Sequence, residues 1–455
     1  MTHASGSGSL IVRDGAKRRP VVLYQPRDEG SVMPLSLLAL GSWLAGEHVV
    51  IVDGRFELAP EARIVELARV ALCLGVTVRT GVPLREAARL SAAARRANPE
   101  LTIVWGGAHA TLDPASCLAT GTVDACALGA GEEPMTAAVE DLRAGRRLRP
   151  RAGLALAQDD TGRREAVPAP ATLWPRADYS LLDVERHFEH RGARRLDYCS
   201  SRGARDGSTW MAIRAERVVA EAAQLGSRYR VSEILFHDED FFGDPARVDE
   251  IAQGFVDGGE RLGWQAGARP QDVVASAPER LRLLAQSGCR KLHLGVAPGV
   301  PPRETLMEAG SRLHEARLAA RFVFDVAEPD RRFDGLDAAV AVARSLCALD
   351  GGFETSIRRV WAPPPDPAGV SLESWARHAE APWPEARAAR RLARATFFFS
   401  EAQRDPGRRL GQHLVRLLAL VRVRLGFFAL DFDRLVVEAS AILRTGRARR
   451  ATRLD

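Results

Sequence analysis

The stretch LTIVWGGAHATLDP, residues 101–114, holds a short apolar run that stops at two glycines. The run predicts a buried strand, and Gly106-Gly107 lets the backbone beyond it come close to a bulky ligand. His109 and Thr111 would then supply polar contacts beside that ligand. Two glycines after a strand are more often a plain tight turn, so this reading depends on the neighbouring sequence.

Apolar runs alternate with amphipathic stretches on both sides of this segment. After a polar, Gly/Ser-rich lead-in of residues 1–20, which we expect to be disordered, the rhythm continues through residues 21–143. It predicts a doubly wound parallel sheet with helices on both faces, a Rossmann-like domain. The apolar runs that we interpret as its strands are VVLYQP, HVVIVDG, ALCLGVTV, LTIVWGG and DACALGAG.

A second alternation follows a Pro- and Arg-rich linker, residues 144–194. Six strands interleaved with helices predict a partial (β/α)6 TIM-like barrel over residues 195–372. Residues 373–455 are helical in pattern and form a C-terminal region. The chain is therefore α/β in class. The six strand-like runs are RLDYCS, VSEILFH, LGWQAGA, KLHLGVA, RFVFDVA and TSIRRVW.

Composition excludes several classes of function. The 455 residues are 46% hydrophobic and 27% charged, which is typical of a globular protein with more than one domain. The net charge of +6 comes from arginines that are interleaved with acidic residues, so we expect no nucleic-acid partner. We find neither a secretory signal nor a transmembrane segment and expect a cytoplasmic protein. The six cysteines form no close pair in the sequence and indicate neither a disulfide framework nor a zinc site.

Ligands of open parallel sheets bind at the carboxyl ends of the strands, so the residues just after each apolar run are informative. The turn at Gly129 and Gly131 would lie against a phosphate or amide, with Glu132 opening a helix. Each of these patterns is weak alone, whereas their joint order is specific. The candidate cofactor-binding residues are Thr77, Thr80, Gly81, Gly106, Gly107, His109, Thr111, Gly129, Gly131 and Glu132.

This order of motifs resembles the cobalamin-dependent radical S-adenosylmethionine (SAM) enzymes over roughly residues 20–375. The motifs that carry the resemblance are VDG, TVRTG, WGGAHATLDP, GAGEEP, SSRG, HDEDFF, WQAGARPQDV and SGCRKLHLGVAPG. The resemblance implies that cobalamin lies on the first domain, base-off. The Asp-x-His-x-x-Gly cobalt ligand motif of other cobalamin folds is absent here, in agreement with that family.

The defining CxxxCxxC motif of the family is missing after the first barrel strand. In the family three thiolates hold a 4Fe-4S cluster whose fourth iron binds SAM. Counting from Gly203, the three ligand positions are Ala204, Ser208 and Met211, which are poor substitutes for thiolates. Ala297 stands where the family has a glutamate that meets the SAM ribose. We therefore predict that the cluster is absent and that SAM binding is weakened.

No other cysteine is placed to replace the missing ligands. Cys199 comes just before the SSRG motif, and we interpret it as a small buried residue rather than a ligand. Cys289 comes before the fourth barrel strand, at the end away from an active site. One thiolate could not hold the cluster in any case.

Polar residues survive at the ends of the second and third barrel strands. The candidate catalytic residues are His237, Asp238, Asp240 and Arg269. A carboxylate cluster at a strand end could bind a metal or a cationic substrate, but in the resembling family it mostly shapes the pocket, and we predict no metal site. The helix at 416–430 either lies on a membrane surface or, as we prefer, is buried.

Three functions remain open. The preferred one is a non-radical pseudoenzyme that binds cobalamin, or keeps only the shape of the fold, and serves as partner or regulator of an intact radical SAM relative or another protein of a biosynthetic pathway. The alternative is a cobalamin-dependent, methyltransferase-like enzyme that works without the cluster and needs an acid or base in its pocket. The third is a working radical enzyme with an unconventional cluster. The substrate and the oligomeric state cannot be read from the sequence.

Overall fold

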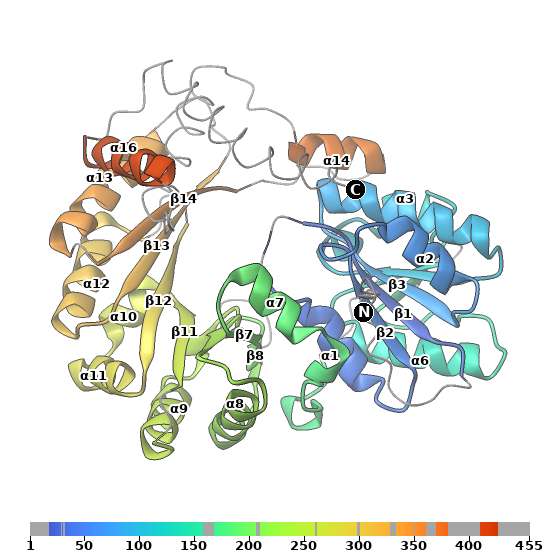
Figure 1. The fold of residues 1–455 in the computed structure, drawn as a ribbon, viewed down its shortest axis with the longest axis horizontal. Coiled ribbons are helices and arrows are strands. Elements are labelled where there is room, and N and C mark those ends of the chain that lie inside the picture. The colour runs from blue at the N-terminus through green and yellow to red at the C-terminus, as the bar shows by residue number, and fades with distance from the viewer. Residues whose placement is uncertain are drawn as a thin grey trace, which may run out of the picture. The chain divides into compact units, whose positions relative to one another are not determined.

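A computed structural model describes residues 18–28, 30, 32–157, 168–205, 210–259, 262–297, 301–327, 334–350, 352–360, 370–380 and 410–425. The chain divides into two compact units (Figure 1). The first unit comprises Met1–His237 with Pro363–Ala381, and the second comprises Asp238–Ala362 with Pro382–Asp455. The predicted disordered lead-in falls almost wholly outside the described residues. The predicted domain boundaries remain predictions.

A six-stranded sheet forms the centre of residues 21–156, with the strand order β2-β1-β3-β4-β5-β6. Its strands are β1 (Val21–Gln25), β2 (Val49–Asp53), β3 (Cys73–Thr77), β4 (Thr102–Gly106), β5 (Ala125–Ala127) and β6 (Leu154–Leu156). The first five strands are parallel, and β6 joins β5 antiparallel. The predicted doubly wound sheet is confirmed, while the antiparallel edge strand was not foreseen, because it lies within residues 144–194, which the sequence predicted to be a linker.

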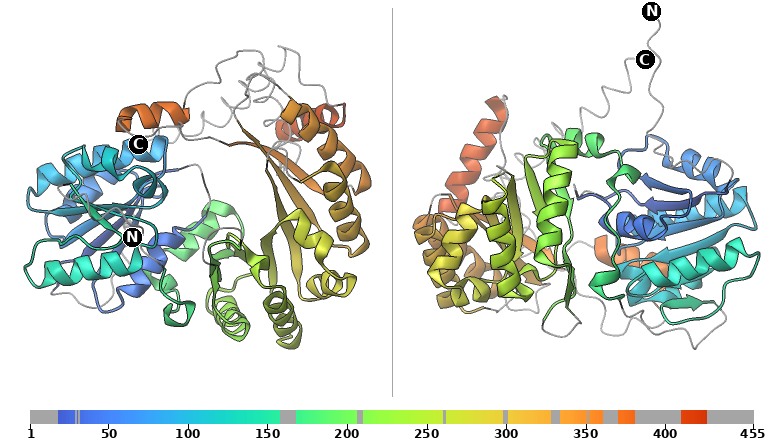
Figure 2. Two further views of the ribbon diagram at one scale, coloured as in Figure 1. Left: turned by 180° about the vertical axis from the view of Figure 1, so that it is seen from behind. Right: turned by 90° about the horizontal axis from the view of Figure 1, so that it is seen from below.

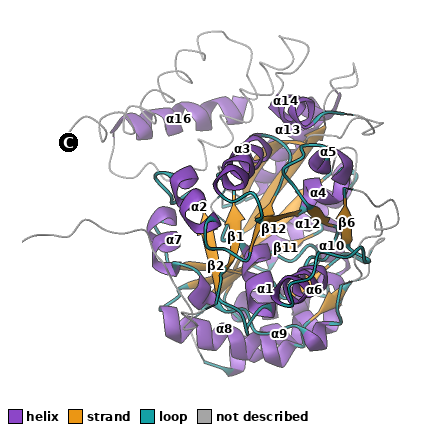
Figure 3. Cartoon of the chain, turned by 90° about the vertical axis from the view of Figure 1, so that its right-hand side faces the viewer, coloured by secondary structure: helices purple, strands orange, loops and turns teal. Residues whose placement is uncertain are grey.

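Helices cover both faces of this sheet. They are α1 (Leu35–Trp43), α2 (Pro60–Ala68), α3 (Val82–Ala97), α4 (Ala108–Leu112), α5 (Pro114–Leu118) and α6 (Glu132–Arg143). One face carries α1 and α6, which lie side by side, and the other carries the neighbouring α2 and α3 (Figures 1 and 3). The strands are apolar because both of their faces are buried; the side chains of Leu23, Ile103 and Trp105, for example, are fully buried.

The strand order fixes where a ligand can reach the sheet. The chain leaves β1 for β2 on one side and then returns to β3 on the other side of β1. The connections that follow β1 and β3 therefore lead away in opposite directions at the carboxyl ends of the strands. In doubly wound sheets this switch point is the usual ligand site.

The six predicted barrel strands are all present, each with a helix close by in the sequence. In the first unit β7 (Arg195–Tyr198) pairs in parallel with β10 (Glu233–Phe236), between α7 (Val184–Arg191) and α8 (Ala215–Tyr229). In the second unit β11 (Gly263–Ala268), β12 (Cys289–Val296), β13 (Ala320–Ala327) and β14 (Glu354–Val360) pair in parallel in chain order. The second unit also contains the helices α9 (Pro245–Asp257), α10 (Pro270–Ala275), α11 (Pro278–Gln286), α12 (Arg303–Glu315) and α13 (Asp334–Leu349), seen in Figure 2.

Two helices come from the predicted C-terminal region and the residues just before it. Helix α14 (Leu372–Glu380) packs on α3 in the first unit (Figure 1). Helix α16 (Leu410–Leu425) exposes Leu417 and Leu420 and buries Ala419. Residues 426–430 of the predicted 416–430 helix lie outside the described residues, and its two interpretations remain predictions. Within the described ranges, no helix has both the length and the apolar character needed to cross a membrane. All six cysteines are free.

Candidate functional site

The ends of β3 and β4 lie on the carboxyl edge of the sheet, beside the switch point between β1 and β3. Thr77 and Gly106, the last residues of the two strands, are paired neighbours. The next residue, Gly107, has a φ of 91° and a ψ of −171°, a conformation available essentially only to glycine. A Cβ atom at Gly107 would lie 2.8 Å from the Thr77 hydroxyl oxygen and 3.1 Å from the Val78 carbonyl oxygen. Glycine therefore allows the turn after β4 to pack directly against the end of β3.

A buried histidine supports the loop after β3. His109 is fully buried, and its Nδ1 lies 3.1 Å from the Thr80 hydroxyl oxygen. Its ring contacts the edge of Trp375 from α14, with the ring centroids 5.2 Å apart, and the Trp375 indole donates to Asp113 at 2.7 Å. In this structure His109 therefore positions the Thr80 hydroxyl from the buried side. The sequence predicted that His109 would itself face the ligand.

The turn after β5 is fixed by two contacts. The Thr111 hydroxyl accepts a hydrogen bond from the Gly129 amide at 2.9 Å. Glu132 opens α6 as predicted, but its carboxylate is ion-paired with Arg202. The Arg202 guanidinium lies 4.7 Å from the centroid of the Trp174 ring. The arginine of the SSRG motif therefore binds Glu132, a contact that the sequence did not predict.

All ten predicted cofactor-binding residues lie at the end of β3 or β4 or after β3, β4 or β5, so the structure does bring them to one edge of the sheet. Thr77, Gly106, Thr111 and Gly131 are half-buried, and Gly129 is exposed. Gly81, with a φ of 104°, starts α3 directly behind Thr80. The edge can thus offer hydroxyl and backbone groups to a large ligand.

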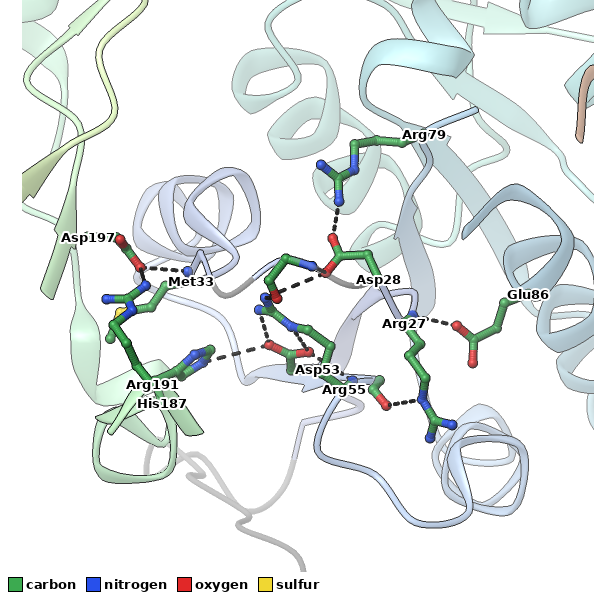
Figure 4. A network of polar contacts seen from close by, with 12 residues as sticks. Arg27, Asp28, Met33, Asp53, Arg55, Arg79, Glu86, His187, Arg191 and Asp197 are labelled. Carbon is green, nitrogen blue, oxygen red and sulfur yellow. Dashed lines mark hydrogen bonds and ion pairs between the residues drawn. The ribbon is translucent and has the colours of Figure 1, made fainter. Parts of the chain in front are cut away.

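Charged side chains at the ends of β1 and β2 form a network (Figure 4). The sequence did not predict these residues as part of the site. Arg55 donates to both Asp53 carboxylate oxygens, at 2.9 and 2.6 Å, and to the Gly30 carbonyl at 2.8 Å. Asp28 is ion-paired with Arg79, so the pair links the loops after β1 and β3. Their position in the sequence could have revealed these charged residues, because each lies at or just after the end of an apolar run.

The sequence also did not predict a role for Asp197, a buried acid in β7. It is fully buried, and its Oδ2 accepts from the Met33 amide at 2.8 Å and from Arg191 at 2.6 Å (Figure 4). Its Oδ1 lies 2.7 Å from Nε2 of His237, one of the four predicted catalytic residues. The other three, Asp238, Asp240 and Arg269, belong to the second unit, where Arg269 donates to Asp240 at 3.2 Å.

The three predicted cluster positions follow the SSRG turn. Arg202 in β8 (Ser201–Arg202) pairs antiparallel with Met211 in β9 (Met211–Ala212), so Met211 is part of a short hairpin. Ala204 is described, whereas Ser208 lies outside the described residues. Cys199 donates through its thiol to the Ser201 carbonyl at 3.1 Å. In the part of the chain that the structure describes, no three His, Cys, Asp or Glu side chains are grouped to hold a metal ion.

The network makes stability depend on pH through His187 of α7. Burial lowers the pKa of His187 from 6.5 to about 4, although Asp53 lies 3.7 Å away and opposes this shift. Between pH 6.5 and pH 4 the unfolded chain therefore binds a proton that the folded chain does not bind. We expect the free energy of unfolding to fall by up to about 3 kcal/mol as the pH is lowered through this window.

Urea unfolding at pH 4, 5, 6 and 7 measures this effect. His187→Gln should remove most of the pH slope, because the titrating group is gone. His190→Gln is the matched control, since His190 lies in the same helix but is exposed. Equal slopes for the wild type and His187→Gln would contradict the assignment.

Comparison with known proteins identifies the first domain. Residues 28–139 match the family model of the B12 binding domain. This segment is a B12-binding domain. It contains all ten predicted cofactor-binding residues, together with Asp28, Asp53, Arg55 and Arg79 of the charged network. Two strands of the sheet lie outside the matched segment, β1 before it and β6 after it.

The similarity extends beyond the B12-binding domain. An uncharacterized methyltransferase of Pyrococcus horikoshii is 25% identical over 346 residues, covering 69% of this chain and 73% of the relative. The radical SAM methyltransferase TsrM from Kitasatospora setae, solved with cobalamin and a 4Fe-4S cluster, has a TM-score of 0.61 at 16% identity, over 75% of this chain and 72% of TsrM. OxsB, a cobalamin-dependent SAM radical enzyme solved with aqua-cobalamin and SAM, has a TM-score of 0.60 at 15% identity, over 80% of this chain and 55% of OxsB. The chain therefore has the fold of cobalamin-dependent radical SAM enzymes.

Proposed function

We propose that the protein binds cobalamin at the carboxyl edge of its B12-binding domain and works without a 4Fe-4S cluster, as a cytoplasmic non-radical partner or regulator of an intact radical SAM relative or of another biosynthetic protein. The observation that carries the cobalamin half is the carboxyl edge of the sheet, which holds Thr77 and Thr80 at and after the end of β3 and Gly107 after β4. Its hydroxyl and backbone groups suit a large polar cofactor. When bound, cobalamin would supply a cobalt centre able to carry a methyl group.

The residues present fit cobalamin but not the cluster. On the cobalamin side, the glycines at 106, 107 and 129 keep the edge free of side chains, while Thr80 is positioned by His109. On the cluster side, Ala204 has no donor atom and Met211 offers only a thioether in a paired strand. Cys199 is a single thiolate at most. This difference between the two donor sets supports a protein that keeps one cofactor of the fold and has lost the other.

Titration with hydroxocobalamin, followed by its visible spectrum, tests the cobalamin half. We expect saturable binding at micromolar concentration, and Thr80→Ala should weaken it about fivefold, because a hydroxyl hydrogen bond contributes about 1 kcal/mol. Thr120→Ala is the matched control. Thr120 precedes β5, at the opposite edge of the sheet, and its hydroxyl also makes a hydrogen bond, to the Cys117 carbonyl. Absence of binding by the wild type would refute cobalamin as the ligand.

A second candidate function is a cobalamin-dependent, methyltransferase-like enzyme that uses polar chemistry in place of radicals. The contact between Asp197 and His237 favours it, because polar transfer to a protic nucleophile needs a base. Loss of turnover in His237→Gln, once a methyl acceptor is known, would separate an enzyme from a regulator.

A further inference from the structure

His237 and Asp197 meet where β7 and β10 end. Phe236, the last residue of β10, is the register partner of Tyr198, and the His237 amide donates to the Tyr198 carbonyl at 2.8 Å. The backbone of His237 is therefore fixed by the sheet. Its ring is fixed by the 2.7 Å contact between Nε2 and Asp197 Oδ1. Asp197 lies three residues before the SSRG motif, and the His237 amide is bound to Tyr198, two residues before that motif.

Asp197 is held as a carboxylate. Burial raises the pKa of this group, but the hydrogen bond and charge of His237, together with Arg191, more than offset burial and hold the pKa below its ordinary value. Arg191 and the Met33 amide occupy Oδ2, which leaves Oδ1 for the histidine. Because a carboxylate accepts hydrogen bonds and donates none, the proton in this contact belongs to Nε2.

The other ring nitrogen of His237 is then the basic one. In the neutral ring with hydrogen on Nε2, the lone pair is on Nδ1. The side chain of His237 is 33% exposed, and among the described residues Nδ1 has no hydrogen-bond partner. A proton acceptor needs such an exposed face.

We propose that His237 accepts a proton at Nδ1 from a protic nucleophile, with a thiol as the simplest case, and that Asp197 is its positioning residue. In this step the S–H bond breaks and an N–H bond forms on Nδ1. The electron pair of the S–H bond stays on sulfur, and the imidazolium is stabilised by the Asp197 carboxylate. Nothing is oxidised or reduced. The class of ligand, a protic nucleophile, rests on the second candidate function. The tautomer of the His237 ring does not depend on that function.

The first test reads the tautomer directly, on the full chain without cobalamin, by 15N NMR of histidine-labelled protein. The wild type should show His237 with hydrogen on Nε2. In Asp197→Asn the amide can donate to Nε2 and leave the hydrogen on Nδ1, so the signal should switch to the other tautomer. Asp183→Asn is the control, because Asp183 only caps α7. Hydrogen on Nδ1 in the wild type would overturn the proposal, even if Asp197→Asn failed to fold.

The second test follows proton transfer with 2-mercaptoethanol as the probe and added methylcobalamin as methyl donor. The thiolate would take the methyl group and cob(I)alamin would leave with the electron pair of the Co–C bond, and the thioether formed is measured. We expect His237→Gln and Asp197→Asn to lower the rate about 100-fold, and Asp183→Asn to leave it unchanged. Wild-type turnover that survives both substitutions would overturn the role of His237. If methylcobalamin does not bind at all, the proposed cofactor fails while the NMR result still decides the dyad.

Discussion

Gly107→Ala is expected to lower the free energy of unfolding by about 3 kcal/mol. The backbone at Gly107, with a φ of 91° and a ψ of −171°, costs a residue with a Cβ atom about 1–3 kcal/mol. The new Cβ would also lie 2.8 Å from the Thr77 hydroxyl oxygen, too close without movement of β3 or of the turn. Because this movement displaces Thr77 and Val78, hydroxocobalamin should bind more weakly as well. Urea unfolding and the cobalamin spectrum measure the two effects.

Gly106→Ala is the matched control for this substitution. Gly106 is the neighbouring residue on the same edge, but its Cβ would meet only ordinary contacts, the Ala127 Cβ at 3.5 Å and the Ala127 carbonyl oxygen at 3.8 Å. It does not have a positive φ. We expect a change within about 1 kcal/mol. If the two alanines destabilised the protein equally, the special packing of Gly107 against β3 would be wrong.

The strands were predictable because their pattern is local. A strand buried on both faces must be apolar along its length, and a parallel neighbour requires a helix between the two, so VVLYQP and LTIVWGG could be assigned from the sequence. The carboxyl-edge residues, such as Thr80 and Gly107, followed from the same rule. The contact of Arg202 with Glu132 did not, because no local pattern pairs residues 70 positions apart.

The polar networks were missed for the same reason. Asp197 receives hydrogen bonds from Met33, 164 residues away, and from His237, 40 residues away. Trp375 reaches Asp113 across 262 residues. The sequence shows the members of each network, but only the fold shows that they meet. His109 illustrates the converse: its position after a strand was predicted, and its burial by Trp375 was not.

The loss of the cluster is the second large expected effect. Three thiolates must converge on one cluster, and the corresponding positions hold Ala204, Ser208 and Met211. The hairpin that pairs Arg202 with Met211 keeps Met211 in a strand. The six cysteines offer no replacement set, since within the described part of the chain no three His, Cys, Asp or Glu side chains are grouped to hold a metal ion. We therefore expect iron binding to fall from about four irons per chain, as in an intact cluster, to well below one.

Anaerobic reconstitution of the full chain with iron and sulfide, followed by iron analysis and the visible spectrum, tests the central claim most directly. A protein that keeps cobalamin and has lost the cluster should retain well under one iron per chain after desalting, show no cluster absorbance, and still bind hydroxocobalamin. About four irons per chain with a cluster spectrum would contradict this assignment and indicate a working radical enzyme with an unconventional set of ligands.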